Sequence, residues 1–313
     1  MFSSILHGLA GIALLYLGGE MLVRGAVAVA VRFGVSVLAI GLTVVSFGTS
    51  APELMVALNA ALRGANDVAV GSVVGSNIAN IGLILALATL IRPAAINRKI
   101  LRIDLPIMVS SGFVLLWMLG TGAIRQWHGI LLLGALGVFI YLTFSHAHRR
   151  PDAYHPELVA TPPPGNGGIV MPIVLTLAGC LALAVGGHLL VDAAVEIALL
   201  TGVSQAVIGL TVVAIGTSLP ELAASIVAAA RGHADIAIGN IVGSNIFNTL
   251  GILGTTAIVT PLTPGGISWS VLWFMMALSV GLYLLMFIGR RLTRAKGVVL
   301  LLAYVYYIAN LVH

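Results

Sequence analysis

An internal duplication is the feature that constrains this chain most. Residues 18–80 match residues 186–248 at a constant offset of 168 without a gap, and 35 of the 63 aligned positions are identical. The strings GLTVV and GTS recur unchanged, and VGSNIAN returns as VGSNIFN. Such agreement indicates a tandem duplication, so the fold must contain two copies of one structural unit.

Composition indicates the medium in which these two copies fold. Of 313 residues, 59% are hydrophobic and 8% are charged, and the mean hydropathy is +1.11. Soluble domains carry about 25% charged residues. The composition therefore excludes a soluble enzyme, a disordered chain and a nucleic-acid-binding protein, and predicts a multi-pass protein of the lipid bilayer. The single cysteine, Cys180, lies in an apolar segment and cannot form an intrachain disulfide.

Hydropathy divides each copy into five apolar spans of membrane-crossing length, for which about 20 residues suffice. The predicted spans are 5–31, 37–62, 68–91, 103–120, 127–145, 170–199, 205–230, 236–259, 268–289 and 297–312. An odd number of spans forces the second copy to enter the membrane upside down, as in transporters built from inverted repeats. We therefore expect an all-α membrane protein with ten helices: a first repeat over 1–145, a linker over 146–168 and a second repeat over 169–313.

The distribution of basic residues predicts the orientation. Alternate loops and span ends on one side carry twelve of the fifteen Lys and Arg residues, whereas the other side carries only Arg63 and Arg125. Cytoplasmic loops are rich in Lys and Arg, so the twelve-charge side should be cytoplasmic and both termini should lie outside an inner membrane. Glu20 and Arg24, four residues apart in the first span, are expected to pair.

The linker is the one long polar stretch. Its prolines and glycines favour a solvated connection between the halves. The alternative is a regulatory metal site built from a group of side chains, namely His146, His148, His155, Asp152 and Glu157.

Two glutamates, Glu53 and Glu221, lie at matching positions inside apolar spans, each after the string Gly-Thr-Ser-x-Pro. Ionisable residues in a membrane interior are costly and mark functional sites by default. The glycine and proline interrupt the second and seventh helices, and Ser50 and Ser218 are placed to cap the helices that restart. The alternative is a neutral carboxyl group that only caps a helix.

All the candidate ligand atoms of this motif are oxygens. Each copy offers a carboxylate, a hydroxyl and backbone carbonyls freed by the break, notably those of Thr49 and Thr217. Ca²⁺ prefers such ligands, whereas the absence of imidazole and thiolate from the motif argues against zinc and copper. Two carboxylates held close together repel each other, so the site should take up cations.

A second paired motif, GSNIAN at 75–80 and GSNIFN at 243–248, supplies further oxygens. Ser76 and Asn80 are four residues apart and share a helix face, as do Ser244 and Asn248. They are placed to complete the coordination of a cation. The accompanying glycines also allow close helix packing.

These four motif blocks, in this order and spacing, resemble the two α-repeats of the sodium/calcium exchanger family, here at 41–80 and 209–248. The resemblance implies that helices 2, 3, 7 and 8 surround the ions and that spans 1 and 6 slide to alternate access. It implies that Glu53 and Glu221 bind Ca²⁺ with the carbonyls of Thr49 and Thr217. It further implies Na⁺ sites that use a set of four serines, namely Ser50, Ser76, Ser218 and Ser244.

The resemblance also bears on details of the transported ions. The family adds a carbonyl ligand one turn before each glutamate motif, at Ser46 and Ala214 here. Asparagine at both Asn80 and Asn248 argues against K⁺ co-transport, because potassium-dependent relatives carry aspartate there. The expected substrates are Ca²⁺ and Na⁺, with no cofactor.

Three alternatives remain open at this stage. The first is a proton-coupled divalent-cation antiporter of the same fold, although its branch usually lacks the Thr-Ser-x-Pro string. The second is an intramembrane hydrolase with a glutamate pair, for which no nucleophile or metal triad is present. The third is a passive cation channel, which does not require an inverted duplication.

Overall fold

The computed structural model describes residues 2–148, 168–200 and 216–311. Seven helices in these ranges are long and apolar enough to cross a membrane, or eight if a bent pair is counted as one span. In the first half the elements are α1 (Phe2–Phe33), α2 (Val37–Ile40), η1 (Gly41–Val45), α3 (Ser46–Thr49), α4 (Ala51–Leu62), α5 (Asn66–Ala79), η2 (Asn80–Leu85), α6 (Ala86–Ile91), β1 (Ala94–Ala95), η3 (Ile100–Asp104), α7 (Leu105–Gly120) and α8 (Gln126–His148).

The described part of the second half has a similar but not identical order. Its elements are α9 (Val170–Leu200), α12 (Leu219–Ala230), α13 (Ala234–Ile246), η7 (Phe247–Ile252), α14 (Leu253–Val259), α15 (Trp269–Phe287), η8 (Ile288–Arg290), β2 (Arg291–Leu292) and α16 (Arg294–Leu311). The predicted seventh span, 205–230, lies partly outside the described residues, and α12 is its second part.

The predicted break in the second span is confirmed. The segments Val37–Thr49 and Ala51–Leu62 are bent by 45° at Ser50. Pro52 occupies the first turn of α4, where its missing N–H deprives the carbonyl of Gly48 of the usual helical donor. Helical bonding resumes at once, because the N–H of Leu54 donates to the carbonyl of Ser50 at 3.1 Å.

The centre of the fold is formed by the two continuous spans that follow the broken helices. The inner part of the span Ala234–Val259 is enclosed by other helices, and most of the inner part of Asn66–Ile91 is enclosed as well. Each changes from α- to π-helical winding at the same place in its repeat, at η2 and η7. Such π-helical turns are frequent at functional sites.

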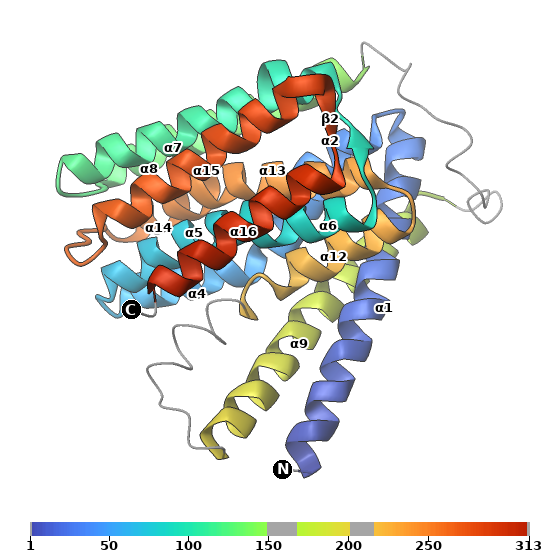
Figure 1. The fold of residues 1–313 in the computed structure, drawn as a ribbon, viewed down its shortest axis with the longest axis horizontal. Helices are drawn as coiled ribbons and strands as arrows, with labels where there is room; N and C mark the ends of the chain where they lie inside the picture. Colours follow the sequence, from blue (N-terminus) through green and yellow to red (C-terminus); the bar gives the residue numbers. More distant parts are fainter. Residues whose placement is uncertain (1, 149–167, 201–215, 312–313) are drawn as a thin grey trace.

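The helices α1 and α9 form a close antiparallel pair that projects from the remaining helices (Figure 1). Glycines allow the approach: a Cβ atom on Gly18 would lie 2.8 Å from the backbone nitrogen of Leu183, and one on Gly186 would lie 2.9 Å from the carbonyl oxygen of Gly11. Gly179 likewise faces Gly18. The contact of Gly11 with Gly186 is thus matched, at the offset of 168, by that of Gly179 with Gly18.

Loops of the two halves pair at opposite ends of the molecule (Figure 1). At one end β1 pairs antiparallel with β2, placing Ala94 opposite Leu292. At the other end an isolated bridge places Ile124 opposite Leu262. These two bridges are also related by the offset of 168, so each half contributes the same pair of segments to opposite ends.

Candidate cation site

The first turns of α4 and α12 place Glu53 and Glu221 inside the protein. Their exposed fractions are 2% and 1%, so neither side chain faces the surrounding lipid. The two helices restart for the same local reason, since Pro52 and Pro220 occupy matching positions in their first turns. The pair of glutamates predicted from sequence is therefore a pair of buried acids.

Serine hydroxyls link the two halves in a crossed arrangement. The Oγ of Ser50 donates to Oε1 of Glu221 at 2.7 Å, and the Oγ of Ser218 donates to Oε1 of Glu53 at 3.4 Å. Ser50 and Ser218 do occupy the N-cap positions, but neither side chain makes a capping hydrogen bond. The capping role expected for the hydroxyls is therefore wrong, because the carboxylate of the other repeat is within reach and accepts more strongly.

Further contacts join these groups into one polar cluster. The Oγ of Ser218 lies 3.3 Å from the Oγ of Ser76. The carboxylates of Glu53 and Glu221 are close enough for each charge to act on the other, and Thr49 contacts Glu221. Like charges in a medium of low dielectric repel strongly, so an additional positive charge at this point is favourable.

Several predicted ligands also present a buried oxygen without a hydrogen-bond partner within the described residues. These oxygens are Oε2 of Glu53, Oε2 of Glu221, Oδ1 of Asn80, Oδ1 of Asn248 and Oγ of Ser244. Buried polar atoms in proteins are otherwise almost always satisfied. Unpaired carboxylate, amide and hydroxyl oxygens are the ligands that Ca²⁺ and Na⁺ prefer.

The structure brings only some of the predicted cation ligands into contact with one another. The contacts join Glu53, Glu221, Ser50, Ser218 and Ser76. Thr49 is fully buried beside them and Thr217 is partly buried, whereas Ala214 lies outside the described residues. Asn80, Asn248 and Ser244 are buried in the central spans, and within the described residues no hydrogen bond joins them to the carboxylates.

Sequence reasoning missed the residues that hold the first broken helix. The Oγ1 of Thr49 donates to Oδ1 of Asn240 at 3.2 Å, and the Oγ of Ser46 donates to the carbonyl of Asn240 at 2.9 Å. The amide of Asn240 in turn donates to Ser225 at 3.0 Å. The repeat gave no signal for Asn240, because its counterpart is Ser72.

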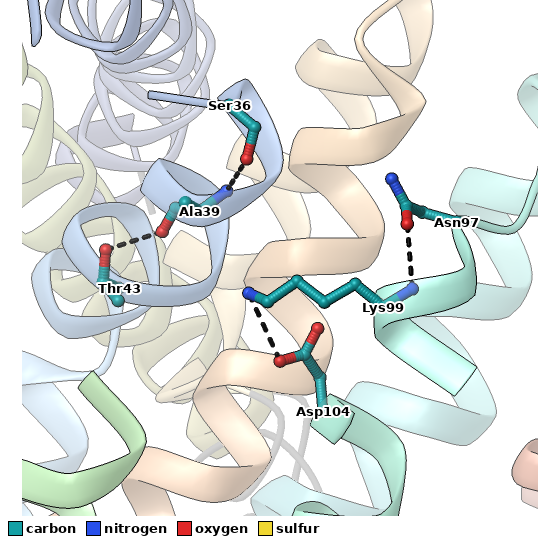
Figure 2. A network of polar contacts seen from close by, with 6 residues as sticks. All are labelled: Ser36, Ala39, Thr43, Asn97, Lys99 and Asp104. Carbon is teal, nitrogen blue, oxygen red and sulfur yellow. Dashed lines mark hydrogen bonds and ion pairs between the residues drawn. The ribbon is translucent and has the colours of Figure 1, made fainter. Parts of the chain in front are cut away.

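Sequence reasoning also missed a buried ion pair. Asp104 is fully buried at the end of η3, and its Oδ1 lies 3.6 Å from Nζ of Lys99. Figure 2 shows the Lys99 side chain extended toward Asp104, while Oδ1 of Asn97 accepts a hydrogen bond from the Lys99 N–H at 2.9 Å. Burial lowers the pKa of the Lys99 ammonium, and the charge of Asp104 opposes that effect. The pair has no equivalent in the second repeat, where Ile267 and Leu272 occupy the matching positions.

Comparisons with known proteins agree with this geometry. A sequence model described as "Sodium/calcium exchanger protein" matches residues 3–145 and 171–312. The putative antiporter CaxA of Alkalimonas amylolytica is 37% identical, and the match covers 98% of both chains. The sodium/calcium exchanger MaX1 of Methanosarcina acetivorans is 31% identical over 97% of each chain.

A solved structure extends the likeness to three dimensions. The sodium-calcium exchanger NCX_Mj, soaked with Na⁺ and Ca²⁺, superimposes with a TM-score of 0.84 at 29% identity, covering 99% of this chain and 98% of that one. The family consists of transporters and not of enzymes. The buried acidic pair, the two sequence matches over nearly the whole chain and this shared fold lead to one conclusion: the protein is a multi-pass membrane protein that belongs to the sodium/calcium exchanger family.

Proposed function

We propose that the protein is a secondary-active antiporter that exchanges Ca²⁺ for Na⁺ by alternating access at the Glu53–Glu221 site. One observation carries the proposal: two buried carboxylates from different halves share a polar cluster in which one oxygen of each has no partner among the described residues. Ca²⁺ would bind both carboxylates together with the carbonyls of Thr49 and Thr217. Na⁺ would use the same charges with hydroxyl and amide oxygens, namely those of Ser50, Ser76, Ser218, Ser244, Asn80 and Asn248.

Exchange follows from the charge of the site. An empty site carries two negative charges that resist passage through an apolar barrier, whereas one Ca²⁺ or several Na⁺ neutralise them. Only a loaded site then switches sides, so movement of one ion requires return of the other. No resident cofactor is needed.

The proposed architecture is ten membrane-spanning helices in two inverted repeats, over 1–145 and 169–313, joined by the linker 146–168. Three observations support it. The equivalent helices α1 and α9 run antiparallel, and the bridges Ala94–Leu292 and Ile124–Leu262 place equivalent segments at opposite ends. The π-helical turns Asn80–Leu85 and Phe247–Ile252 also recur to within one residue of the offset of 168.

The proposed orientation places the basic end in the cytoplasm and both termini outside the inner membrane. The pairing of β1 with β2 brings two basic loops together, 92–99 and 290–296, and the Arg294 guanidinium donates to the carbonyl of Leu90 at 2.9 Å. Charges that collect at one end are consistent with the positive-inside rule.

Ion dependence of Ca²⁺ flux tests the proposed function. In proteoliposomes loaded with Na⁺, we expect uptake of radiolabelled Ca²⁺ that saturates and that stops when internal Na⁺ is replaced by choline. The control is a pH gradient of either sign in the absence of Na⁺. Uptake that follows the pH gradient would replace Na⁺ by H⁺ as the driving ion, and uptake without any counter-ion would indicate a channel.

An ion pair between α1 and the end of α12 is expected to restrain the sliding of α1 during alternating access. The guanidinium of Arg231 donates to Oε1 of Glu20 at 2.5 Å, and Arg24 lies 3.3 Å from Oε2 of the same carboxylate, which confirms the pair expected from sequence. Glu20 is buried, whereas both arginines are substantially exposed. Because α1 is the proposed sliding helix, this contact ties it to the ion-binding core at the basic end.

Glu20→Gln is therefore expected to favour opening at the basic end. Removal of an exposed ion pair of this kind should shift the equilibrium by at most roughly fivefold. With Cys180→Ala as background, the rate at which a cysteine placed at Ser76 reacts from the cytoplasmic side should rise by that factor. Asp192→Asn, which removes the exposed carboxylate of the His188 pair on α9, is the matched control and should leave the rate unchanged.

A further inference from the structure

One residue of the repeated GSN motif has no part in the proposed coordination. Asn77 follows Ser76, yet its side chain points to another asparagine: the Nδ2 of Asn248 donates to Oδ1 of Asn77 at 3.1 Å. The Nδ2 of Asn77 then donates to Oγ1 of Thr249 at 3.1 Å. All three side chains are almost fully buried. They form a relay of two hydrogen bonds between the central spans of the two repeats.

The neighbours of Asn77 set the direction of this relay. The Nδ2 of Asn77 also lies 3.9 Å from Sδ of Met275, an atom that accepts hydrogen bonds but has none to donate. The amide nitrogen of Asn77 therefore belongs on the side of Met275 and Thr249. The Oδ1 of Asn77 consequently faces Asn248 and accepts a hydrogen bond from the NH₂ group of Asn248.

This direction decides which end of Asn248 remains available. An amide side chain has an oxygen end that can bind a cation and an NH₂ end that repels one. Because Asn77 holds the NH₂ end, Oδ1 of Asn248 is the buried atom left without a partner within the described residues. The relay thus presents an oxygen ligand before any cation arrives.

The first repeat lacks this relay although its motif is nearly the same. Asn245 stands where Asn77 stands, but its Nδ2 donates to the carbonyl of Ile241 in its own helix at 3.0 Å. Ile81 takes the place of Thr249 and has no polar atom in its side chain. Within the ranges that the structure describes, no asparagine relay holds the amide of Asn80.

We propose that Asn77 and Thr249 are positioning residues that orient the amide of Asn248, and that they make the two asparagine ligands of the site unequal. The inference rests on the proposed function, because it requires Asn248 to bind a transported cation. Asn248 then contributes more to cation affinity than Asn80, despite their identical side chains and matching positions. In the duplicated motif, the amide of Asn248 is thus held in its binding orientation before a cation arrives, whereas the amide of Asn80 is not.

The test uses the full chain in proteoliposomes, with the half-saturating Na⁺ and Ca²⁺ concentrations and the maximal rate measured separately. Asn77→Ala should raise the half-saturating concentration of at least one ion about five- to tenfold, the effect of losing one buried hydrogen bond. Thr249→Val should raise it about threefold, and Thr249→Ser should restore the wild-type value. Asn245→Ala, which removes a buried asparagine outside the relay, is the matched control and should stay within about twofold.

A double-mutant cycle separates the relay from its ligand. In an Asn248→Ala background, Asn77→Ala should have no further effect on the half-saturating concentrations. If the two effects multiply instead, Asn77 does not act through Asn248 and the inference fails. If Asn248→Ala itself leaves both concentrations unchanged, the proposed ligand role of Asn248 fails. If only Asn248→Ala has an effect, its ligand role stands and the relay is rejected. Should Asn77→Ala not fold, the comparison of Thr249→Val with Thr249→Ser decides.

Discussion

Replacing Glu53 or Glu221 by glutamine should reduce Na⁺-driven Ca²⁺ uptake at least a hundredfold. Each substitution keeps the size of the side chain but removes one of the two negative charges that bind the divalent ion. Loss of one partner from a buried ionic contact costs about 3–5 kcal/mol, which corresponds to a loss of roughly 10²–10⁴-fold in affinity. The measurement is initial uptake of radiolabelled Ca²⁺ into Na⁺-loaded proteoliposomes at a fixed, low external Ca²⁺ concentration.

Asp67→Asn provides the matched control for that experiment. Its carboxylate accepts a hydrogen bond from the N–H of Gly266 at 2.9 Å in an exposed contact at the start of α5, outside both glutamate motifs. Uptake by this variant should stay close to that of the wild type. Uptake by Glu53→Gln or Glu221→Gln within about twofold of the wild type would refute the ligand assignment for that residue. Because a serine of the other repeat contacts each glutamate, both carboxylates belong to one cluster and both variants should fail.

Gly18→Val should have the second large effect, on stability as well as transport. The new Cβ would lie 2.8 Å from the backbone nitrogen of Leu183 and 3.0 Å from the carbonyl oxygen of Gly179. Backbone atoms cannot rotate away as side chains can, so α1 and α9 must separate along their contact. Overpacking of this kind costs about 1–3 kcal/mol where side chains yield, and more here because the clash is with backbone.

Thermal unfolding in detergent, followed by the fraction of monodisperse protein, measures that loss. Gly137→Val is the matched control, because Gly137 also lies within a long helix, α8, but a Cβ there meets no atom within 4 Å. The control should unfold near the wild-type temperature, whereas Gly18→Val should unfold well below it and transport little Ca²⁺. Equal unfolding temperatures for the two variants would show that close approach of α1 and α9 is not needed.

Much of the fold could be predicted because the signals are local. The spans expected at 68–91 and 103–120 appear at Asn66–Ile91 and Ile100–Gly120. Their length follows from the thickness of the apolar layer and their limits from the charges beside them. The break at Ser50 was equally predictable, since Pro52 cannot supply the missing N–H in any environment.

Other features could not be predicted because they depend on segments that meet only after folding. Lys99, at the end of the basic loop 92–99, pairs with Asp104, although neither belongs to the repeated motifs. Asn240 holds Thr49 across 191 positions of sequence, and its counterpart Ser72 bonds instead to Ala69 in its own helix. The offset of 168 carries no information about either contact, because the two copies have diverged at these positions.

By itself the sequence determined that the protein is a duplicated membrane protein of two equivalent halves, each with one acid behind a broken helix. It did so because apolar span length, proline chemistry and a repeated motif act on neighbouring residues. Only the tertiary structure decided the partners of those groups. It turned Ser50 away from capping and toward Glu221, and it held Asn248 through Asn77 while leaving Asn80 without such a relay. The physical reason is that a hydrogen bond forms with whichever acceptor packing brings within about 3 Å, and packing unites residues that are far apart in the chain.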